Sequence, residues 1–234
     1  MNADKQKKAA AEFALKVVTS DVKIGLGSGS TANYFIEAAA AKVKREKLNT
    51  IFVSTSAPTS ALAQKLGMNV KNIEDAPYLD FTVDGADEID PQFRMIKGGG
   101  GALLREKIVA TSSRIMVCIC DNSKRVETLG KFPLPVEVSR WGVNPTAWKI
   151  ERALQQLGYT DAKMRLRADV DGKPFVTDSG NAIIDLALDK ISDHERLESV
   201  MNNMPGVIEV GLFIGICGVL ILGTDKGVEE ITRK

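Results

Sequence analysis

The feature that most constrains the fold is the alternation of short apolar runs with helix-like segments in the first half of the chain. The apolar runs predict strands and the amphipathic segments predict helices, in the order 23–26 (strand), 31–44 (helix), 50–54 (strand), 58–66 (helix), 79–83 (strand), 102–110 (helix) and 115–120 (strand). Strands and helices that alternate with short connections are typical of a parallel sheet covered on both faces. In such sheets, ligands bind outside the carboxyl ends of the strands.

The pattern changes after Lys131-Phe-Pro-Leu-Pro135, because closely spaced prolines interrupt regular structure. The residues beyond it predict strands at 136–139, 162–167, 181–186 and 207–210, and helices at 145–157 and 194–201. This βαββαβ order is typical of a ferredoxin-like unit. We therefore expect an α/β fold in which residues 1–131 and 207–234 form a Rossmann-like open sheet, with a small ferredoxin-like α+β domain inserted at 132–206. A strand at 219–222 and a short helix after Asp225 would complete the larger domain.

Composition and charge exclude several classes of protein. Hydrophobic residues make up 44% and charged residues 26% of the 234-residue chain, which is a globular composition. With 31 Lys and Arg against 30 Asp and Glu, the net charge of +1 gives no strong field to attract nucleic acid or an anionic membrane. The longest uncharged stretch, 210–224, is interrupted by glycines and is shorter than the roughly 20 residues that span a bilayer. The amino terminus lacks the apolar core of a secretory signal, so we expect a cytoplasmic protein.

The histidine and cysteine content argues against a transition-metal site or a disulfide scaffold. The single histidine, His194, excludes a multi-histidine metal site, and we expect it to be exposed at the start of a helix. Three cysteines are too few for a disulfide scaffold. Cys118 and Cys120 alternate to the same face of a predicted strand, where buried thiols behave as small apolar side chains. No transition-metal site is therefore predicted from these residues.

A first glycine-rich segment, Gly25-Leu-Gly-Ser-Gly-Ser-Thr31, follows a predicted strand and opens a helix. Its glycines let the backbone pass close to a ligand, and the helix N-terminus offers free N–H groups to a phosphate. A dinucleotide site needs a carboxylate at the end of the second strand, which instead ends Val53-Ser-Thr-Ser56, and the Gly-Lys-Ser/Thr of a Walker motif is absent. The segment predicts a compact phosphate or polyol site or, alternatively, a tight turn that binds nothing.

An acidic segment, Val83-Asp-Gly-Ala-Asp-Glu-Ile-Asp90, follows the third predicted strand. Its four carboxylates repel one another, so an ordered segment of this kind indicates a paired acid–base site or a divalent-metal site. The alternative is a solvated acidic loop. Asp84 and Asp87 lie three residues apart around Gly85, and we expect them to face the same cleft.

A third segment, Lys97-Gly-Gly-Gly-Gly-Ala-Leu-Leu-Arg-Glu-Lys107, runs from four consecutive glycines into a helix that carries Glu106. Such a loop is costly in backbone entropy and usually admits the close approach of another group, although the charged residues by themselves also fit a solvated helix face. We expect all three segments to converge at one edge of one sheet. Lys124 follows the next strand, in Asp121-Asn-Ser-Lys124, and is a candidate for the same cleft.

In order and spacing, these segments resemble ribose-5-phosphate isomerase of the A type. The resemblance rests on GLGSGST, VDGADEID, MIKGGGGALLREKI and DNSK followed by LGKFPLPVEV, which cover the first 140 residues, with weaker echoes in VTDSGNAIID, MPGVIEVGLF and GTDKGV. It implies an aldose–ketose isomerase of the non-oxidative pentose phosphate pathway. Such an enzyme interconverts D-ribose 5-phosphate and D-ribulose 5-phosphate through an enediolate, without metal or organic cofactor. The resemblance also implies a cytoplasmic homo-oligomer, a dimer or tetramer, whose partner is a sugar phosphate rather than nucleic acid or a membrane.

Matching motifs imply roles for individual residues. Glu106 would be the base that moves a proton between C2 and C1, while Asp84, Asp87 and Lys97 would handle the sugar oxygens in ring opening and in stabilising the enediolate. The remaining substrate-binding residues would be Lys7, Ser28, Gly29, Ser30, Thr31, Gly85, Ala86, Gly98, Gly99, Gly100 and Lys124. The chemistry agrees, because proton abstraction beside a carbonyl needs a poised carboxylate and a positive charge at the developing oxyanion.

Two alternatives remain open from the sequence. A sugar-phosphate isomerase-deaminase of related architecture would be expected to use histidine, and His194 lies outside the cleft motifs. A non-catalytic sugar-phosphate-binding regulator on the same scaffold could lose Glu106 or Lys97, whereas both residues are present, and no residues are left over for a nucleic-acid-binding domain.

Overall fold

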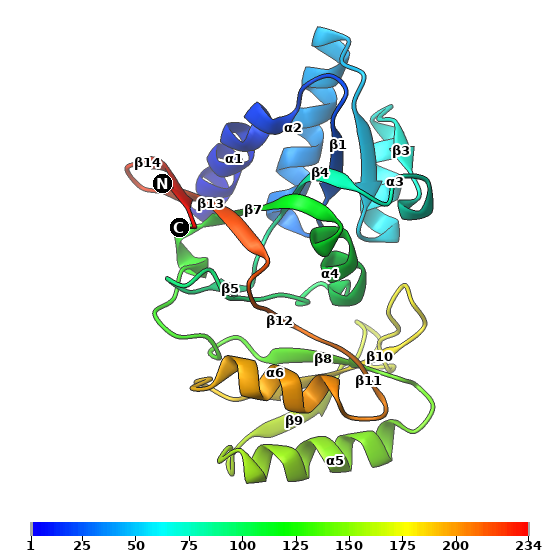
Figure 1. The fold of residues 1–234 in the computed structure, drawn as a ribbon, viewed down its shortest axis with the longest axis vertical. Coiled ribbons are helices and arrows are strands. Elements are labelled where there is room, and N and C mark those ends of the chain that lie inside the picture. The colour runs from blue at the N-terminus through cyan, green and yellow to red at the C-terminus, as the bar shows by residue number, and fades with distance from the viewer. Residues whose placement is uncertain (1, 234) are drawn as a thin grey trace.

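Three sheets organise the chain in the computed structural model, which describes residues 2–233 (Figure 1). A seven-stranded sheet and a four-stranded sheet lie at opposite ends of the molecule, with a small three-stranded sheet between them. The helices are α1 (Ala3–Phe13), α2 (Ser30–Glu46), α3 (Ala57–Lys65), α4 (Leu103–Thr111), α5 (Val143–Gln156) and α6 (His194–Asn202). Short 3-10 helices cover Ala14–Val17, Ile73–Asp75 and Asn122–Lys124.

The seven-stranded sheet is parallel except at one edge, as the strand–helix alternation predicts. Its order is β14-β13-β7-β4-β1-β2-β3, and only β14 runs antiparallel to its neighbour. The strands are β1 (Lys23–Leu26), β2 (Ile51–Ser54), β3 (Val70–Lys71), β4 (Leu79–Asp84), β7 (Ser113–Asp121), β13 (Cys217–Thr224) and β14 (Gly227–Thr232). The central strands β1 and β4 are adjacent, so the loops after them open side by side.

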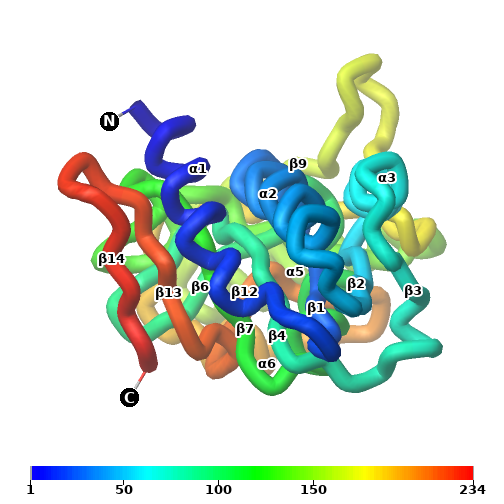
Figure 2. Tube along the Cα trace, turned by 90° about the horizontal axis from the view of Figure 1, so that it is seen from above, coloured from blue at the N-terminus to red at the C-terminus, as the bar shows by residue number. Residues whose placement is uncertain are grey.

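Both faces of this sheet are covered, because side chains alternate along each strand. Along β7, Val117 and Ile119 join the core beneath α1 and α2, which lie over the sheet in Figure 2. Cys118 and Cys120 point to the other face, as predicted, and are completely or almost completely buried there. The three-stranded sheet packs on that second face, in the order β12 (Leu212–Phe213), β6 (Met95–Ile96) and β5 (Glu88–Ile89).

The four-stranded sheet has the ferredoxin-like arrangement. Its order is β11-β8-β10-β9 and every neighbouring pair is antiparallel. The strands are β8 (Leu134–Val138), β9 (Lys163–Leu166), β10 (Ala182–Ala187) and β11 (Val207–Val210). Helices α5 and α6 pack on one face of this sheet through a shared apolar core. The other face of the sheet is turned towards the rest of the molecule. The expected fold class, a Rossmann-like open sheet combined with a ferredoxin-like unit, is confirmed.

Three details differ from the sequence-based expectations. The 207–210 strand pairs with β8 as β11, which completes the predicted βαββαβ order, whereas the predicted boundary after residue 206 assigns this strand to the larger domain. The residues after Asp225 form β14 instead of a helix, because Thr224 and Gly227 pair across a two-residue hairpin turn. His194 is only 3% exposed instead of solvated, and burial lowers the pKa of its imidazole. The division of the chain into two domains stays a prediction, with its second boundary best placed after Val210.

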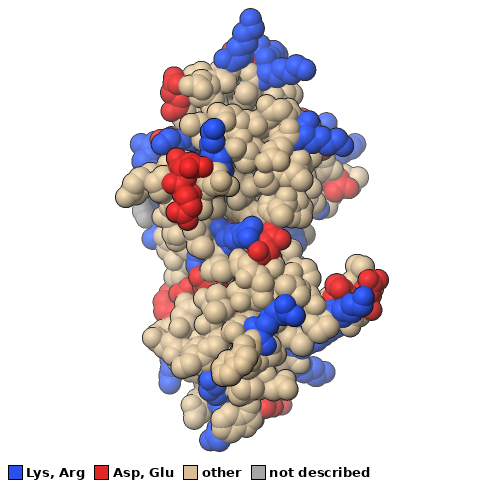
Figure 3. Space-filling model, turned by 90° about the vertical axis from the view of Figure 1, so that its right-hand side faces the viewer, with Lys and Arg blue, Asp and Glu red and all other residues tan. Residues whose placement is uncertain are grey.

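Charge is dispersed over the surface. The face drawn in Figure 3 carries Lys and Arg side chains interspersed with Asp and Glu, without a broad area of one sign. Within residues 2–233, no helix is long and apolar enough to cross a membrane.

The packing of α1 on β13 gives a first prediction, which concerns stability. Gly223 lies so close to α1 that an added Cβ would be 2.1 Å from the Gln6 carbonyl oxygen, which belongs to the backbone and cannot move aside by itself. Gly223→Ala is therefore expected to lower the free energy of unfolding by about 1–3 kcal/mol, the usual cost of overpacking. Urea denaturation of Gly223→Ala and of the control Gly100→Ala, whose Cβ would meet nothing within 4 Å, provides the measurement. Equal stability of Gly223→Ala and the unaltered protein would contradict this packing.

Candidate active site

The segments singled out in the sequence meet around one pocket of about 150 Å³. The pocket opens at the carboxyl ends of β1 and β4 and in front of α4, the position at which parallel α/β sheets bind ligands. It is lined by Lys7, Ser28, Gly29, Ser30, Thr31, Gly85, Ala86, Asp87, Lys97, Gly98, Gly99, Gly100, Glu106 and Lys124. Of the residues that the sequence proposes for the site, only Asp84 is absent from this lining.

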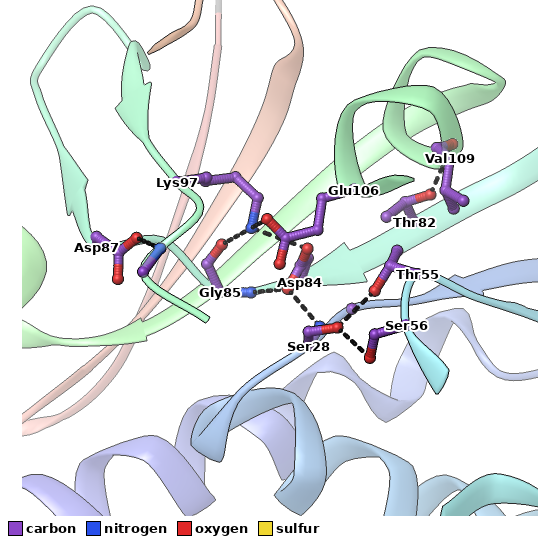
Figure 4. A network of polar contacts seen from close by, with 12 residues as sticks. Ser28, Thr55, Ser56, Thr82, Asp84, Gly85, Asp87, Lys97, Glu106 and Val109 are labelled. Carbon is purple, nitrogen blue, oxygen red and sulfur yellow. Dashed lines mark hydrogen bonds and ion pairs between the residues drawn. The ribbon is translucent and has the colours of Figure 1, made fainter. Parts of the chain in front are cut away.

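A buried lysine forms the centre of the site (Figure 4). The Lys97 ammonium lies 2.8 Å from Asp84 Oδ2 and 3.4 Å from Glu106 Oε2, and it donates a hydrogen bond of 2.6 Å to the Gly85 carbonyl. The side chains of Lys97, Asp84 and Glu106 are at most 5% exposed. The three residues come from β4, the loop after β6 and the first turn of α4, so the packing of these elements brings one cation between two carboxylates.

Asp84, the last residue of β4, lies beneath the pocket and connects two of its loops. Its Oδ1 accepts hydrogen bonds from the Ser28 N–H, at 3.1 Å, and from the Gly85 N–H, at 2.7 Å. Gly27 is required for this contact, because a Cβ there would be 2.0 Å from Asp84 Oδ1. From the sequence, we expect the glycines of the first segment to make room for a ligand. At Gly27 the group that comes close is instead the carboxylate of Asp84.

Burial and charge shift the pKa values of all three groups. Burial raises the pKa of Glu106 to about 8, against the opposing charge of Lys97 and with the added repulsion of Asp84 and Asp87. Burial likewise raises the pKa of Asp84 above its ordinary value, although Lys97 opposes the rise. Burial alone would lower the pKa of Lys97, but the negative charges of Asp84 and Glu106 outweigh it and raise the pKa. Lys97 is therefore a permanent cation, and Glu106 is a carboxyl group that can take and release a proton near neutral pH.

The acidic segment divides between the pocket and the scaffold. Asp87 accepts a hydrogen bond of 2.7 Å from the Gly99 N–H on the pocket wall. Glu88 instead accepts from the N–H groups of Gly130 and Phe132, and Asp90 forms an ion pair of 2.7 Å with Arg94. The four carboxylates therefore do not converge on one point. In the part of the chain that the structure describes, no three His, Cys, Asp or Glu side chains are grouped to hold a metal ion.

The opposite end of the pocket has the features of an anion site. Ser30 begins α2, a helix of 17 residues whose first N–H groups have no partner within the helix. Lys7 of α1 and Lys124 of the 3-10 helix Asn122–Lys124 line the same pocket. A phosphate placed here would meet N–H groups, hydroxyls and two ammonium groups.

A cluster of hydroxyls behind this loop was missed by the sequence analysis. The Ser28 hydroxyl lies 2.8 Å from both the Thr55 and the Ser56 hydroxyl oxygens and 3.2 Å from that of Thr59 (Figure 4 draws the first two contacts). These residues follow β2, where the sequence was searched for a carboxylate. Their position at the carboxyl end of β2, the parallel strand next to β1, was the available signal.

The fold and the site define a class of protein: an α/β protein with a small polar pocket at the point where the order of the parallel strands reverses. The groups at one end of this pocket suit an anion, and those at the other end suit proton transfer. Residues 51–227 match the family model for ribose 5-phosphate isomerase A (phosphoriboisomerase A). Ribose-5-phosphate isomerase A of Parvibaculum lavamentivorans is 53% identical over 231 residues, covering 99% of each chain, and that of Rhodopseudomonas palustris strain HaA2 is 47% identical over the whole of each chain. The chain belongs to the ribose-5-phosphate isomerase A family.

Solved structures agree with this assignment. A D-ribose-5-phosphate isomerase in complex with phospho-erythronic acid has a TM-score of 0.90 at 38% identity, with all of both chains covered. The ribose 5-phosphate isomerase of Plasmodium falciparum has a TM-score of 0.93 at 32% identity, with 99% of both chains covered. His194, which a deaminase would be expected to use, lies in α6 and does not line the pocket.

The central lysine gives a prediction on stability and its pH dependence. Lys97→Met leaves two buried carboxyl groups without their cation, so their pKa values rise further. Well below pH 3.8 both carboxyls are protonated in the folded and the unfolded chain. As the pH rises from there towards 8, the unfolded chain releases these protons while the folded chain retains them, and stability is lost. We expect Lys97→Met to cost about 3–5 kcal/mol at pH 8 and less at pH 5.

Urea denaturation at the two pH values measures this effect, with Lys163→Met as the exposed control. An equal loss of stability at both pH values would contradict the role assigned to the buried charges.

Proposed function

We propose that this protein interconverts D-ribose 5-phosphate and D-ribulose 5-phosphate through an enediolate, with Glu106 as the base. The observation that carries the proposal is the Glu106 carboxyl at the pocket wall, 3.4 Å from a buried ammonium. The high pKa of Glu106 suits a group that must both accept and return a proton. Membership of the isomerase family supports the same reaction.

The reaction begins with the open-chain aldose, whose C1 carries the carbonyl and whose C2 carries the hydrogen to be moved. The Glu106 carboxylate takes this hydrogen as a proton, the C2–H electron pair becomes the C1–C2 double bond, and the carbonyl electrons move onto O1. The Lys97 ammonium stabilises the negative oxygen that forms. Protonated Glu106 then returns the proton to C1, and the O2 proton is transferred to the negative O1, so that C2 becomes the ketone carbonyl and C1 carries a hydroxyl.

The two aspartates are proposed to have different roles, Asp87 at the sugar oxygens and Asp84 at the protein groups that surround them. Asp87 lines the pocket and would exchange protons with the ring oxygen and with the hydroxyls during ring opening and enediolate formation. Asp84 lies beneath the pocket, where it holds Lys97 and the loop of Ser28 in place. We propose that Gly85, Ala86 and the 98–100 glycines bind the sugar through their backbone groups.

The phosphate is proposed to bind between the N-terminus of α2 and two lysines. Ser28, Gly29, Ser30 and Thr31 would supply N–H and hydroxyl donors, while Lys7 and Lys124 would supply charge. No metal or organic cofactor takes part in this proposal. It places the enzyme in the cytoplasm, as a homodimer or homotetramer of the non-oxidative pentose phosphate pathway, in line with the family resemblance.

Formation of ketose from ribose 5-phosphate by the purified protein tests the proposal directly. Unphosphorylated D-ribose is the control substrate, and it should react far more slowly because it lacks the group that the α2 end of the pocket binds. Absence of turnover with ribose 5-phosphate would overturn the proposal.

The base gives a prediction on rate and pH. Glu106→Gln preserves size but cannot accept the carbon-bound proton, so kcat should fall by about 10²–10⁴. In the unaltered enzyme, kcat/KM should rise with pH and level off above an apparent pKa near 8, because only the deprotonated carboxylate accepts the proton.

Steady-state kinetics from pH 6 to 10 would measure both effects, with Glu127→Gln as the exposed control. A Glu106→Gln protein that is folded and has near-normal kcat would assign the base role to Asp84 or Asp87 instead.

The phosphate end gives a prediction on binding. Lys124→Ala removes a charged contact that is remote from the reacting carbons, so KM should rise roughly 10-fold while kcat changes much less. Initial-rate kinetics of Lys124→Ala and of the exposed control Lys131→Ala measure the difference. An unchanged KM would remove Lys124 from the binding site.

A further inference from the structure

Arg167 connects the four-stranded sheet to the glycine loop of the pocket. It follows β9, and its guanidinium is held by Asp185 of β10, with Nε 2.9 Å from Oδ2 and Nη2 2.5 Å from Oδ1. The remaining nitrogen, Nη1, donates to the carbonyl oxygens of Gly98, at 2.7 Å, and Gly99, at 3.2 Å. The arginine side chain is only 14% exposed, so these bonds are largely shielded from water.

These two bonds fix the orientation of two peptide groups. In a trans peptide, the C=O of one residue and the N–H of the next point in opposite directions. With the Gly98 C=O turned towards Arg167, the Gly99 N–H is turned away from it and meets Asp87 at 2.7 Å. With the Gly99 C=O turned the same way, the Gly100 N–H also faces away from Arg167.

An aromatic ring supports the same loop next to Arg167. A Cβ on Gly101 would be 2.4 Å from the Phe175 ring, so this ring packs directly on the backbone of the loop. The Arg167 guanidinium lies 5.9 Å from the centre of that ring, and the Phe175 N–H donates to the Arg167 carbonyl. The loop has almost no side chains of its own, so its conformation depends on what packs behind it.

We propose that Arg167 is a positioning residue for the reaction, which acts through the peptide groups of Gly98 and Gly99 to orient Asp87 and the donors of the glycine loop. Asp185 aligns the guanidinium, so the ferredoxin-like unit takes part in shaping the pocket. The proposal rests on the proposed function for its turnover measurements only. A lysine cannot replace Arg167, because one ammonium does not match both the carboxylate and the two carbonyl oxygens that the planar fork reaches.

The loop itself is tested first, by amide hydrogen exchange, which is independent of any activity. Arg167→Gln should speed exchange in the segment 98–101 and leave the core strands β1 and β4 unchanged. Arg165→Gln is the matched control, because Arg165 lies on the same strand and is exposed. Exchange in 98–101 that is equal in both variants and in the unaltered protein would overturn the proposal.

Ligand binding and turnover give the second test. Phospho-erythronic acid, the ligand of a solved relative, should bind Arg167→Gln about 10-fold more weakly than Arg165→Gln. With ribose 5-phosphate, kcat/KM should fall about 10- to 100-fold, mainly through kcat, since the reacting end is misplaced while the lysines of the phosphate end are untouched. Arg167→Lys should restore thermal stability but not kcat.

The outcomes separate this proposal from the proposed function. An unaltered protein that binds phospho-erythronic acid but does not isomerise ribose 5-phosphate would refute the function alone, and exchange and binding would still decide the role of Arg167. A second outcome would overturn the proposal. If kcat falls only in proportion to the loss of folded protein, while KM, the affinity for phospho-erythronic acid and amide exchange in 98–101 stay unchanged, Arg167 has a structural role alone. If Arg167→Gln does not fold, the same measurements on Arg167→Lys and Asp185→Asn decide it, and unaltered values in both would refute it.

Discussion

The site depends on one buried ammonium between two buried carboxyl groups. Lys97 lies 2.8 Å from Asp84 and 3.4 Å from Glu106, and none of the three side chains has appreciable contact with solvent. Two carboxylates alone would be too costly to bury, and a lysine alone would lose its proton. Together they keep one permanent cation beside a carboxyl group with a pKa of about 8. Proton transfer next to a carbonyl requires this combination of a cation and a carboxyl group. The strands and the glycine loop keep Lys97, Asp84 and Glu106 in these positions.

The glycines serve the protein's own packing as much as the approach of a ligand. A Cβ at Gly27 would be 2.0 Å from the Asp84 carboxylate, and a Cβ at Gly99 would be 2.5 Å from that of Asp87. Each glycine therefore makes room for an acidic side chain that donors from the backbone then bind. A loop without side chains cannot hold its shape unaided, and Arg167 and Phe175 of the ferredoxin-like unit pack against it from behind. The smaller unit thus contributes to the pocket without lining it.

Much of the fold and of the candidate site could be predicted from local patterns. The strand–helix alternation predicts the parallel order around β1 and β4, and the βαββαβ rhythm predicts the order of the four-stranded sheet. The sequence was less informative where the structure depends on contacts between residues that are far apart in the chain. The residues after Asp225 become a strand because a tight turn returns them to β13. The burial of His194 likewise depends on what packs over the start of α6.

The sequence by itself determined which chemical groups are available and which loops carry them, because glycine-rich turns and acidic residues at strand ends are local features. That is why the residues proposed for the pocket converge, with Asp84 directly beneath it. Only the tertiary structure decided how these groups interact. It set Lys97 between two carboxyls, sent Glu88 and Asp90 to the scaffold, and brought Arg167 onto the glycine loop 68 residues before it. These contacts join residues far apart in the chain, and their strength comes from burial, which no local pattern encodes.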